Sequence, residues 1–176
     1  METLISDKDF DLTEIIDGVE VMGPSPFGRH QDISMRIVDI ILYHLRKNRT
    51  GNLYFSPLDV ILEEGVQVLQ PDIIFIRNEN MGIFQDYIRG APDMVCEIVS
   101  KGSVTKDTVT KKKIYEKFGV AEYWIVIPEL ETIEVFTLEG NAYEVFSIAE
   151  GGGVVKSRVI DGLEIANKDV FGDFGF

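Results

Sequence analysis

A strand, a helix and a second strand follow one another in the centre of this chain, and that order limits the fold more than any other feature. Residues 93–99 and 122–128 are rich in β-branched and aromatic side chains, which is typical of buried strands. Residues 106–118 between them have helical periodicity, and Gly119 fits a helix C-terminus. Such a crossover predicts two parallel strands with a right-handed connection.

Strand-like alternation also marks four runs outside this unit: residues 52–62, 66–77, 132–138 and 142–148. The first two read as an antiparallel pair joined by a turn, and a helix is expected before them at about residues 28–48. The tail adds one more strand and a short helical turn. We therefore expect an α/β fold with a mixed central sheet flanked by helices and with extra C-terminal strands, in a single domain over residues 1–176.

The composition indicates a soluble, cytoplasmic protein. With 176 residues, of which 45% are hydrophobic, the chain can bury a core without disulfides. Cys96 is the only cysteine, so no disulfide can form within the chain and a reducing compartment is the natural setting. The N-terminal segment is acidic and no apolar stretch approaches about 18 residues, so no membrane segment is expected.

The net charge of −13 argues against a broad surface for nucleic acid, because nonspecific DNA affinity comes mainly from Lys and Arg. The charge is unevenly distributed, however. Residues 101–117 contain six lysines and two acidic residues, a local net charge of +4, which leaves −17 for the remainder. One face of the molecule could therefore still be basic.

Glu97 interrupts the apolar strand at 93–99. A carboxylate inside a buried strand costs several kcal/mol unless a base, a hydrogen-bond donor or a metal ion compensates it. Strand alternation puts Asp93 on the same face, but four residues at about 3.3 Å each separate the two by about 13 Å, too far to share one ion. Asp93 follows Pro92 at the strand entrance, which also fits a turn or capping residue.

Asp72 is a second candidate acid. It follows Pro71 at the start of the run "DIIFI", where an antiparallel neighbour could bring it beside the middle of strand 93–99. An Asp after Pro can also simply mark the start of a strand. Two carboxylates on neighbouring strands are the usual oxygen site for Mg²⁺, with Mn²⁺ as an alternative ion.

A lysine is a recurrent companion of such a pair, because its ammonium group can orient water and offset phosphate charge. Of the three lysines at 111–113, helical spacing places Lys111 on the face of the apolar residues three, four and seven positions later. Lys112 and Lys113 fall on faces with other charged residues. Lys111 is expected to point inward, although it could also extend along the core edge or pair with Asp107.

These residues resemble the PD-(D/E)XK nuclease superfamily, which has the restriction-endonuclease-like fold. "QPD" at residues 70–72, followed by Glu97 in a central strand, is similar to its motif. The segments "EIIDGVEVMGPSPFGRHQ", "FSPLDVIL" and "GAPDMVCEIVSKGSVTKDTVTKKKIYEKFGVAEYWIVIP" resemble, more narrowly, the Uma-type endonuclease family over about residues 10–140. The resemblance implies a metal-dependent nuclease acting on DNA, in which Asp72 and Glu97 bind the ion.

The chain departs from the superfamily motif at the lysine, because Val99 stands two residues after Glu97. In the Uma-type family the lysine lies in the following helix, in an Asp-Lys-Tyr spacing that matches Asp107, Lys111 and Tyr115. The resemblance thus implies that Lys111, which helical spacing also selects, is the catalytic lysine.

Two further residues are candidates near the ion. His30 stands at the start of the first helix, where nucleases of this fold can place a polar group. It could also contact phosphate or simply face solvent. Gln70 could assist from the "QPD" segment.

The leading interpretation is a Mg²⁺-dependent endonuclease that hydrolyses DNA phosphodiester bonds. Two alternatives stay open: a noncatalytic nuclease-fold module for interaction or DNA binding, which the acidic charge favours, and a protein that binds or hydrolyses a smaller phosphate compound. The apolar tail "VFGDFGF" at residues 170–176 predicts a homodimer or higher homo-oligomer, because little chain is left to cover it.

Overall fold

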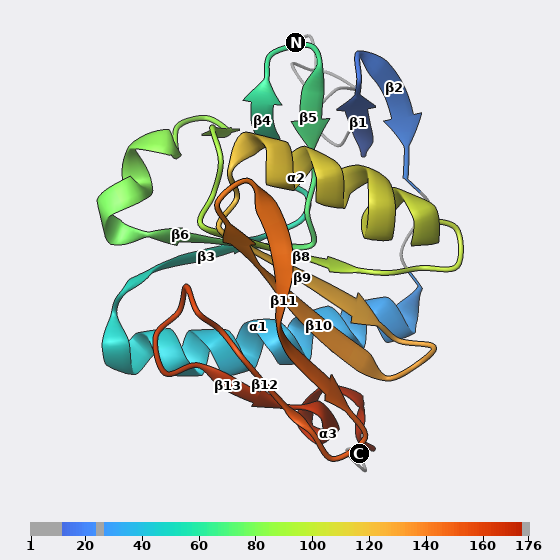
Figure 1. Cartoon of the computed structure of the whole chain (residues 1–176), viewed down its shortest axis with the longest axis vertical. Coiled ribbons are helices and arrows are strands. Elements are labelled where there is room, and N and C mark those ends of the chain that lie inside the picture. The colour runs from blue at the N-terminus through green and yellow to red at the C-terminus, as the bar shows by residue number, and fades with distance from the viewer. Residues whose placement is uncertain (1–11, 24–26, 174–176) are drawn as a thin grey trace, which may run out of the picture.

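A six-stranded mixed sheet forms the centre of the molecule, which a computed structural model describes over residues 12–23 and 27–173 (Figure 1). In the order β11-β10-β9-β8-β6-β3, its strands are β3 (Gly51–Phe55), β6 (Ile73–Arg77), β8 (Met94–Ile98), β9 (Glu122–Ile127), β10 (Thr132–Glu139) and β11 (Ala142–Glu150). β8 and β9 run parallel, and all other neighbours in this sheet run antiparallel. The predicted crossover and the mixed central sheet are therefore confirmed.

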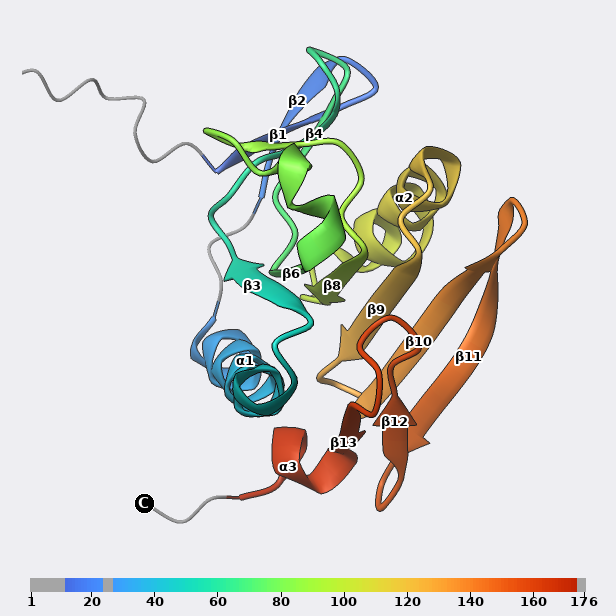
Figure 2. The same cartoon turned by 90° about the vertical axis from the view of Figure 1, so that its left-hand side faces the viewer.

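Helices cover both faces of this sheet, because strand alternation gives each face its own apolar side chains. α1 (Gly28–Asn48), at the predicted position, buries one apolar stripe against the first face: Ile33, Ile37, Ile41 and Leu45. α2 (Lys112–Phe118) covers the opposite face, on which Val95 packs with Tyr115 (Figure 2). Glu97 shares the face of Val95 and so points toward α2 rather than α1.

The helix expected over residues 106–118 begins with a different geometry. η2 (Lys106–Lys111) is a π-helix that continues directly into α2. Gly119 then ends the helix, as predicted, with a left-handed φ of 81° that glycine adopts without strain. The wider turn of a π-helix shifts the side chains from α-helical spacing, yet Lys111 at the junction is buried.

A second sheet of five short strands lies beside α2 (Figure 1). In the order β2-β1-β5-β4-β7, its strands are β1 (Thr13–Ile16), β2 (Val19–Met22), β4 (Val60–Glu63), β5 (Gln67–Leu69) and β7 (Ile88–Arg89). The short helix η1 (Asn78–Ile83) connects β6 to β7. The second sheet brings the N-terminal strands next to the central crossover.

The two strands expected over residues 52–62 and 66–77 are each divided between the sheets, so that prediction is wrong in its boundaries. β3 pairs with β6 in the six-stranded sheet, whereas β4 and β5 form a hairpin in the other. Pro57 and Pro71 lie in the two breaks, and proline has no N–H to donate to a strand ladder. The second break leaves Asp72 at the boundary between the sheets.

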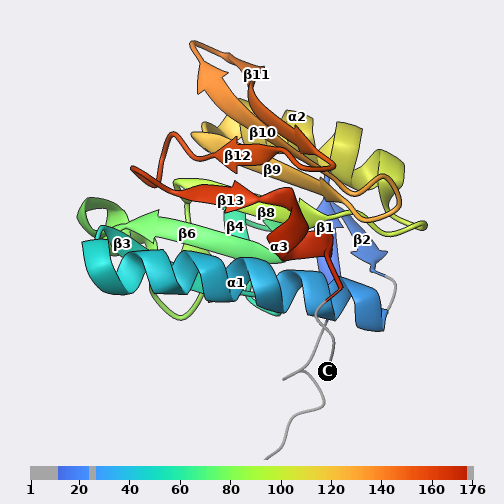
Figure 3. The ribbon, with the colours of Figure 1, turned by 90° about the horizontal axis from the view of Figure 1, so that it is seen from below.

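The C-terminal segment adds β12 (Val154–Lys156), β13 (Glu164–Ala166) and α3 (Asn167–Phe171), and α3 lies beside α1 (Figure 3). Val170 is fully buried and Phe171 packs against the core, so the expectation of an uncovered tail is wrong for these residues. Residues 174–176 lie outside the described part of the chain. Within residues 12–23 and 27–173, no helix is long and apolar enough to span a membrane.

Glu122 fixes this segment to the central sheet. Its carboxylate is fully buried and accepts hydrogen bonds from Trp124 Nε1 and Ser157 Oγ, both at 2.7 Å, and from Arg158 N at 2.6 Å. A buried acid with this many donors has a structural role. It does not line the cleft described next.

Candidate active site

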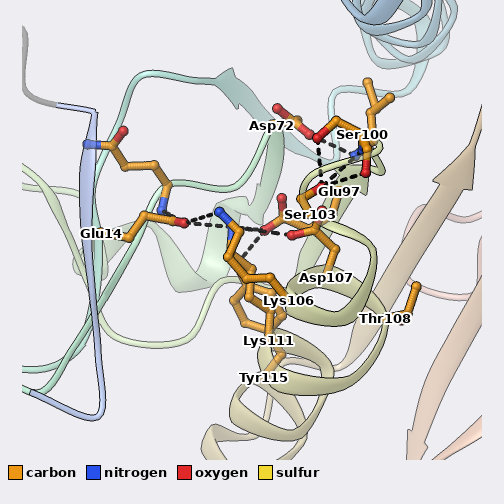
Figure 4. Close-up of polar contacts among 12 residues, drawn as sticks. Glu14, Asp72, Glu97, Ser100, Ser103, Lys106, Asp107, Thr108, Lys111 and Tyr115 are labelled. Atoms are coloured by element: carbon orange, nitrogen blue, oxygen red, sulfur yellow. Dashed lines mark hydrogen bonds and ion pairs between the residues drawn. The ribbon is translucent and has the colours of Figure 1, made fainter. Parts of the chain in front are cut away.

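One cleft collects ionisable side chains where the two sheets, the first turn of α1 and η2 meet (Figure 4). Its volume is about 230 Å³. The ionisable residues that line it are Glu14, His30, Asp72, Glu97, Lys106, Asp107 and Lys111. Gln70 also lines the cleft, so the fold brings together five of the six residues selected from the sequence.

Glu97 finds its partners on the helical segment opposite β8. Its Oε1 accepts hydrogen bonds from Lys111 Nζ and from Tyr115 Oη, each at 2.9 Å, and the residue is 3% exposed. Burial raises the pKa of Glu97 well above its ordinary value, although Lys111 opposes the shift. The carboxylates of Asp107 and Asp72 add to the increase. A positive charge nearby is therefore needed to keep Glu97 ionised.

Lys111 supplies that charge from a fully enclosed position. Its Nζ lies 2.6 Å from Glu14 Oε1, 2.9 Å from Glu97 Oε1 and 3.9 Å from Asp107 Oδ1, and the residue is 2% exposed. Burial alone would lower the pKa of Lys111, but these carboxylates outweigh it and raise the pKa. Lys111 is therefore ionised, and its contact with Asp107 is the weakest of the three.

Glu14, on β1 of the second sheet, is the functional candidate that sequence reasoning missed. Its Oε1 contacts Lys111 and accepts a hydrogen bond from Gln70 N at 2.9 Å, while Oε2 accepts one from Lys106 Nζ at 2.9 Å. Burial opposes the ionised form, but Lys111 outweighs it and lowers the pKa of Glu14. A usable signal was present, because strand alternation puts Glu14 on the buried face of Ile16.

Asp72 is held from the other side of the cleft. Its Oδ2 accepts a hydrogen bond from Ile98 N at 2.7 Å and lies 3.2 Å from His30 Nε2 in the first turn of α1. Burial would lower the pKa of His30, but the Asp72 carboxylate outweighs this and raises it. His30 is therefore a partner of Asp72, the proposed metal ligand, and lies near the site, as expected from the sequence.

Gln70 and Asp93 occupy less central positions. The side chain of Gln70 donates from Nε2 to Asp59 Oδ1 at 2.8 Å, and its backbone N–H donates to Glu14 Oε1 at 2.9 Å. Asp93 does not line the cleft, because it lies at the opposite end of β8. There its carboxylate accepts hydrogen bonds from Arg77 N at 2.8 Å and Asn80 Nδ2 at 2.7 Å, which connect it to the end of β6 and to η1.

The acids of the cleft have the donor chemistry of a magnesium site. Among the described residues, no hydrogen bond reaches Oδ1 of Asp72 or Oε2 of Glu97, because every donor to these carboxylates binds the other oxygen. Mg²⁺ takes one or two carboxylates and completes its shell with water and substrate oxygens. Asp72 and Glu97 offer two carboxylates of this kind, and the described residues contain no group of three His, Cys, Asp or Glu side chains arranged to hold a metal.

A family comparison decides the kind of protein. The family model for Uma2, described as "Putative restriction endonuclease", matches residues 4–168. The chain belongs to this family. This match is longer than the resemblance noted over about residues 10–140, and it includes strands of both larger sheets.

The fold of this Uma2 member recurs in a solved structure. The crystal structure of a protein from Anabaena variabilis, described as "a putative nuclease", superposes with a TM-score of 0.72. The two sequences are 24% identical, and the match covers 90% of this chain and 89% of the other. The restriction-endonuclease-like fold is thereby confirmed. No curated protein matches the chain significantly.

Proposed function

We propose that this protein is a Mg²⁺-dependent endonuclease that hydrolyses DNA phosphodiester bonds. One observation carries the proposal. Two carboxylates, Asp72 and Glu97, line a single cleft, and one oxygen of each accepts no hydrogen bond from the residues that the structure describes; the ammonium group of Lys111 lies against the second acid. Membership of a nuclease family supports the reaction class.

Asp72 and Glu97 would hold the ion, with Mn²⁺ as an alternative to Mg²⁺. When bound, such an ion lowers the pKa of its water and stabilises the charge that develops on a phosphate. Lys111 favours the ionised form of Glu97 that an ion requires, against the burial that raises the pKa of this acid. His30 would orient Asp72 through Oδ2, and the described donors to Asp72 leave Oδ1 for the ion.

Lys106 is suited to the phosphate side of the reaction. Its side chain is 20% exposed, whereas that of Lys111 is 2% exposed, and both ammonium groups contact Glu14. A partly exposed lysine in a cleft can exchange a carboxylate for a phosphate oxygen. Glu14 is then a positioning residue that holds the two lysines in place.

A noncatalytic nuclease-fold module is the second candidate. The raised pKa of Glu97 favours it, because a protonated carboxyl group is a poor metal ligand. In that case the cleft would bind nucleic acid or a smaller phosphate compound without cleaving it. Metal binding therefore separates the two functions.

The test is calorimetric titration of Mg²⁺ into the wild-type protein, Glu97→Gln and the control Glu144→Gln, together with a DNA cleavage assay. Glu144 is exposed on β11 and does not line the cleft. We expect wild type and Glu144→Gln to bind the ion and cleave, and Glu97→Gln to lose about 10²-fold or more in rate. Equal Mg²⁺ binding by wild type and Glu97→Gln would refute the assignment.

A further inference from the structure

An exposed aromatic ring stands at the wall of the candidate active site. Phe55, the last residue of β3, lines the cleft that holds Asp72 and Glu97, and it is 60% exposed. Two backbone contacts hold Phe55 next to Asp72. Phe55 pairs with Ile73 across the sheet, and the N–H of Ser56 donates to the carbonyl oxygen of Asp72 at 3.1 Å. The backbone that carries the ring is therefore held beside a proposed metal ligand.

The fold itself makes no evident use of this ring. Among the described residues, Phe55 takes part in no aromatic stacking, whereas its neighbour Tyr54 stacks on Phe84 with ring centroids 4.5 Å apart. Leu12 and Pro57 also line the cleft, so its lining includes apolar as well as charged residues. An exposed aromatic beside polar groups is characteristic of a ligand contact.

Lysines in and near the cleft already contact other groups of the protein, so few of them are available to bind a long phosphate backbone. Lys106 and Lys111 are directed to Glu14, and Lys112 lies over the ring of Phe136, 3.3 Å from its centroid. The whole chain carries a net charge of −13. Affinity for nucleic acid must then come from contacts other than many ion pairs, and base stacking is the main sequence-tolerant alternative.

We propose that Phe55 stacks on the base of an unpaired nucleotide, so that the preferred substrate of the cleft is single-stranded DNA rather than continuous duplex. A base inside a duplex is already stacked on both sides and cannot offer its face to the ring. The cleft of about 230 Å³ is also smaller than the pockets of roughly 300–1,000 Å³ that enclose drug-sized ligands, so a base would lie against the exposed ring of Phe55 rather than be enclosed. This inference rests on the proposed function for its substrate class.

The test measures binding without cleavage, in buffer with a chelator. A single-stranded oligonucleotide carrying 2-aminopurine reports stacking through quenching of its fluorescence, and anisotropy of labelled oligonucleotides gives the dissociation constants for single strand, duplex and RNA of the same sequence. The proteins compared are wild type, Phe55→Leu, Phe55→Trp and the control Phe146→Leu, which removes a ring that is 43% exposed on β11. Unfolding curves verify that each variant folds.

We expect wild type, Phe55→Trp and Phe146→Leu to quench 2-aminopurine and to prefer single-stranded DNA. Phe55→Leu should lose the quenching and weaken single-strand affinity by about 5- to 150-fold, the range for one base stacked on an aromatic ring, with little change for duplex.

Equal affinity of wild type for single strand and duplex, or unchanged quenching in Phe55→Leu, would overturn the inference even if DNA is cleaved. Tighter binding of the RNA strand would overturn the assignment to DNA. Loss of quenching in Phe55→Leu would support the stacking site even if no Mg²⁺-dependent cleavage is found. The experiment therefore distinguishes failure of the proposed cleavage from failure of the proposed stacking.

Discussion

Replacing Lys111 gives the most direct test of the proposed active site. Three acids, Glu14, Glu97 and Asp107, surround its ammonium group, and it is the innermost cation of the cleft. Replacing it removes the electrostatic support of Glu97. It also leaves buried carboxylates unpaired, which typically destabilises a fold by about 3–5 kcal/mol.

We predict that Lys111→Ala lowers the rate of Mg²⁺-dependent DNA cleavage by about 10²–10³-fold, as loss of a positioned electrostatic group typically does. Lys112→Ala and Lys113→Ala should cause milder losses that shrink as salt is raised, because neither lysine lines the cleft: Lys113 is exposed and Lys112 lies over the ring of Phe136. The measurement is cleavage rate at two salt concentrations, below the unfolding transition of each variant. Equal defects in all three variants would show that the helix contributes only a basic surface.

At the scale of elements, Glu14 connects β1 of the second sheet to η2. Its carboxylate contacts Lys106 and Lys111, so the second sheet and η2 are linked through an ionised side chain that is 3% exposed. The folded protein holds the pKa of Glu14 below its ordinary value of 4.5. The stability gained from this shift is therefore present above pH 4.5 and is lost as the pH falls through the lower, folded-state pKa.

We predict that the stability difference between wild type and Glu14→Gln is largest near neutral pH and decreases on acidification below pH 4.5. The glutamine side chain cannot ionise, so the variant lacks this contribution at every pH. Urea unfolding of both proteins across the acid range measures the difference. A difference that is constant with pH would mean that Glu14 is not ionised in the folded protein.

At the scale of the whole molecule, self-association stays a prediction. Its basis is now the surface of β11 and β12 instead of the C-terminal tail. Val170 of the tail is buried, whereas β11 and β12 carry four exposed apolar side chains: Val145, Phe146, Ile148 and Val154. β11 is also an edge strand of the six-stranded sheet. Exposed apolar edges promote pairing between copies of a chain.

Light scattering over a range of concentrations should therefore show a dimer or higher oligomer of the wild-type protein. Phe146→Lys should shift the protein toward monomer, because the charge cannot be buried between two copies. Tyr43→Lys, at an exposed position on α1, is the matched control. A wild-type protein that is monomeric at every concentration would contradict this prediction.

The sequence by itself determined the features that depend on one element or on two consecutive ones. The crossover from β8 through α2 to β9 follows from apolar alternation and helical spacing over a few residues at a time. Glu97 and Lys111 meet because a short connection joins two elements whose inward faces the sequence already marks. The same alternation separates Asp93 from Glu97 along one strand.

Only the tertiary structure decided which distant residues complete the cleft. Glu14 reaches Lys106 across 92 positions, and His30 reaches Asp72 from a different element. It also decided that two strand runs divide at Pro57 and Pro71, which places Asp72 between the sheets. No local pattern marks these contacts, because they depend on how two sheets pack together, and that packing is set by apolar burial summed over the whole chain.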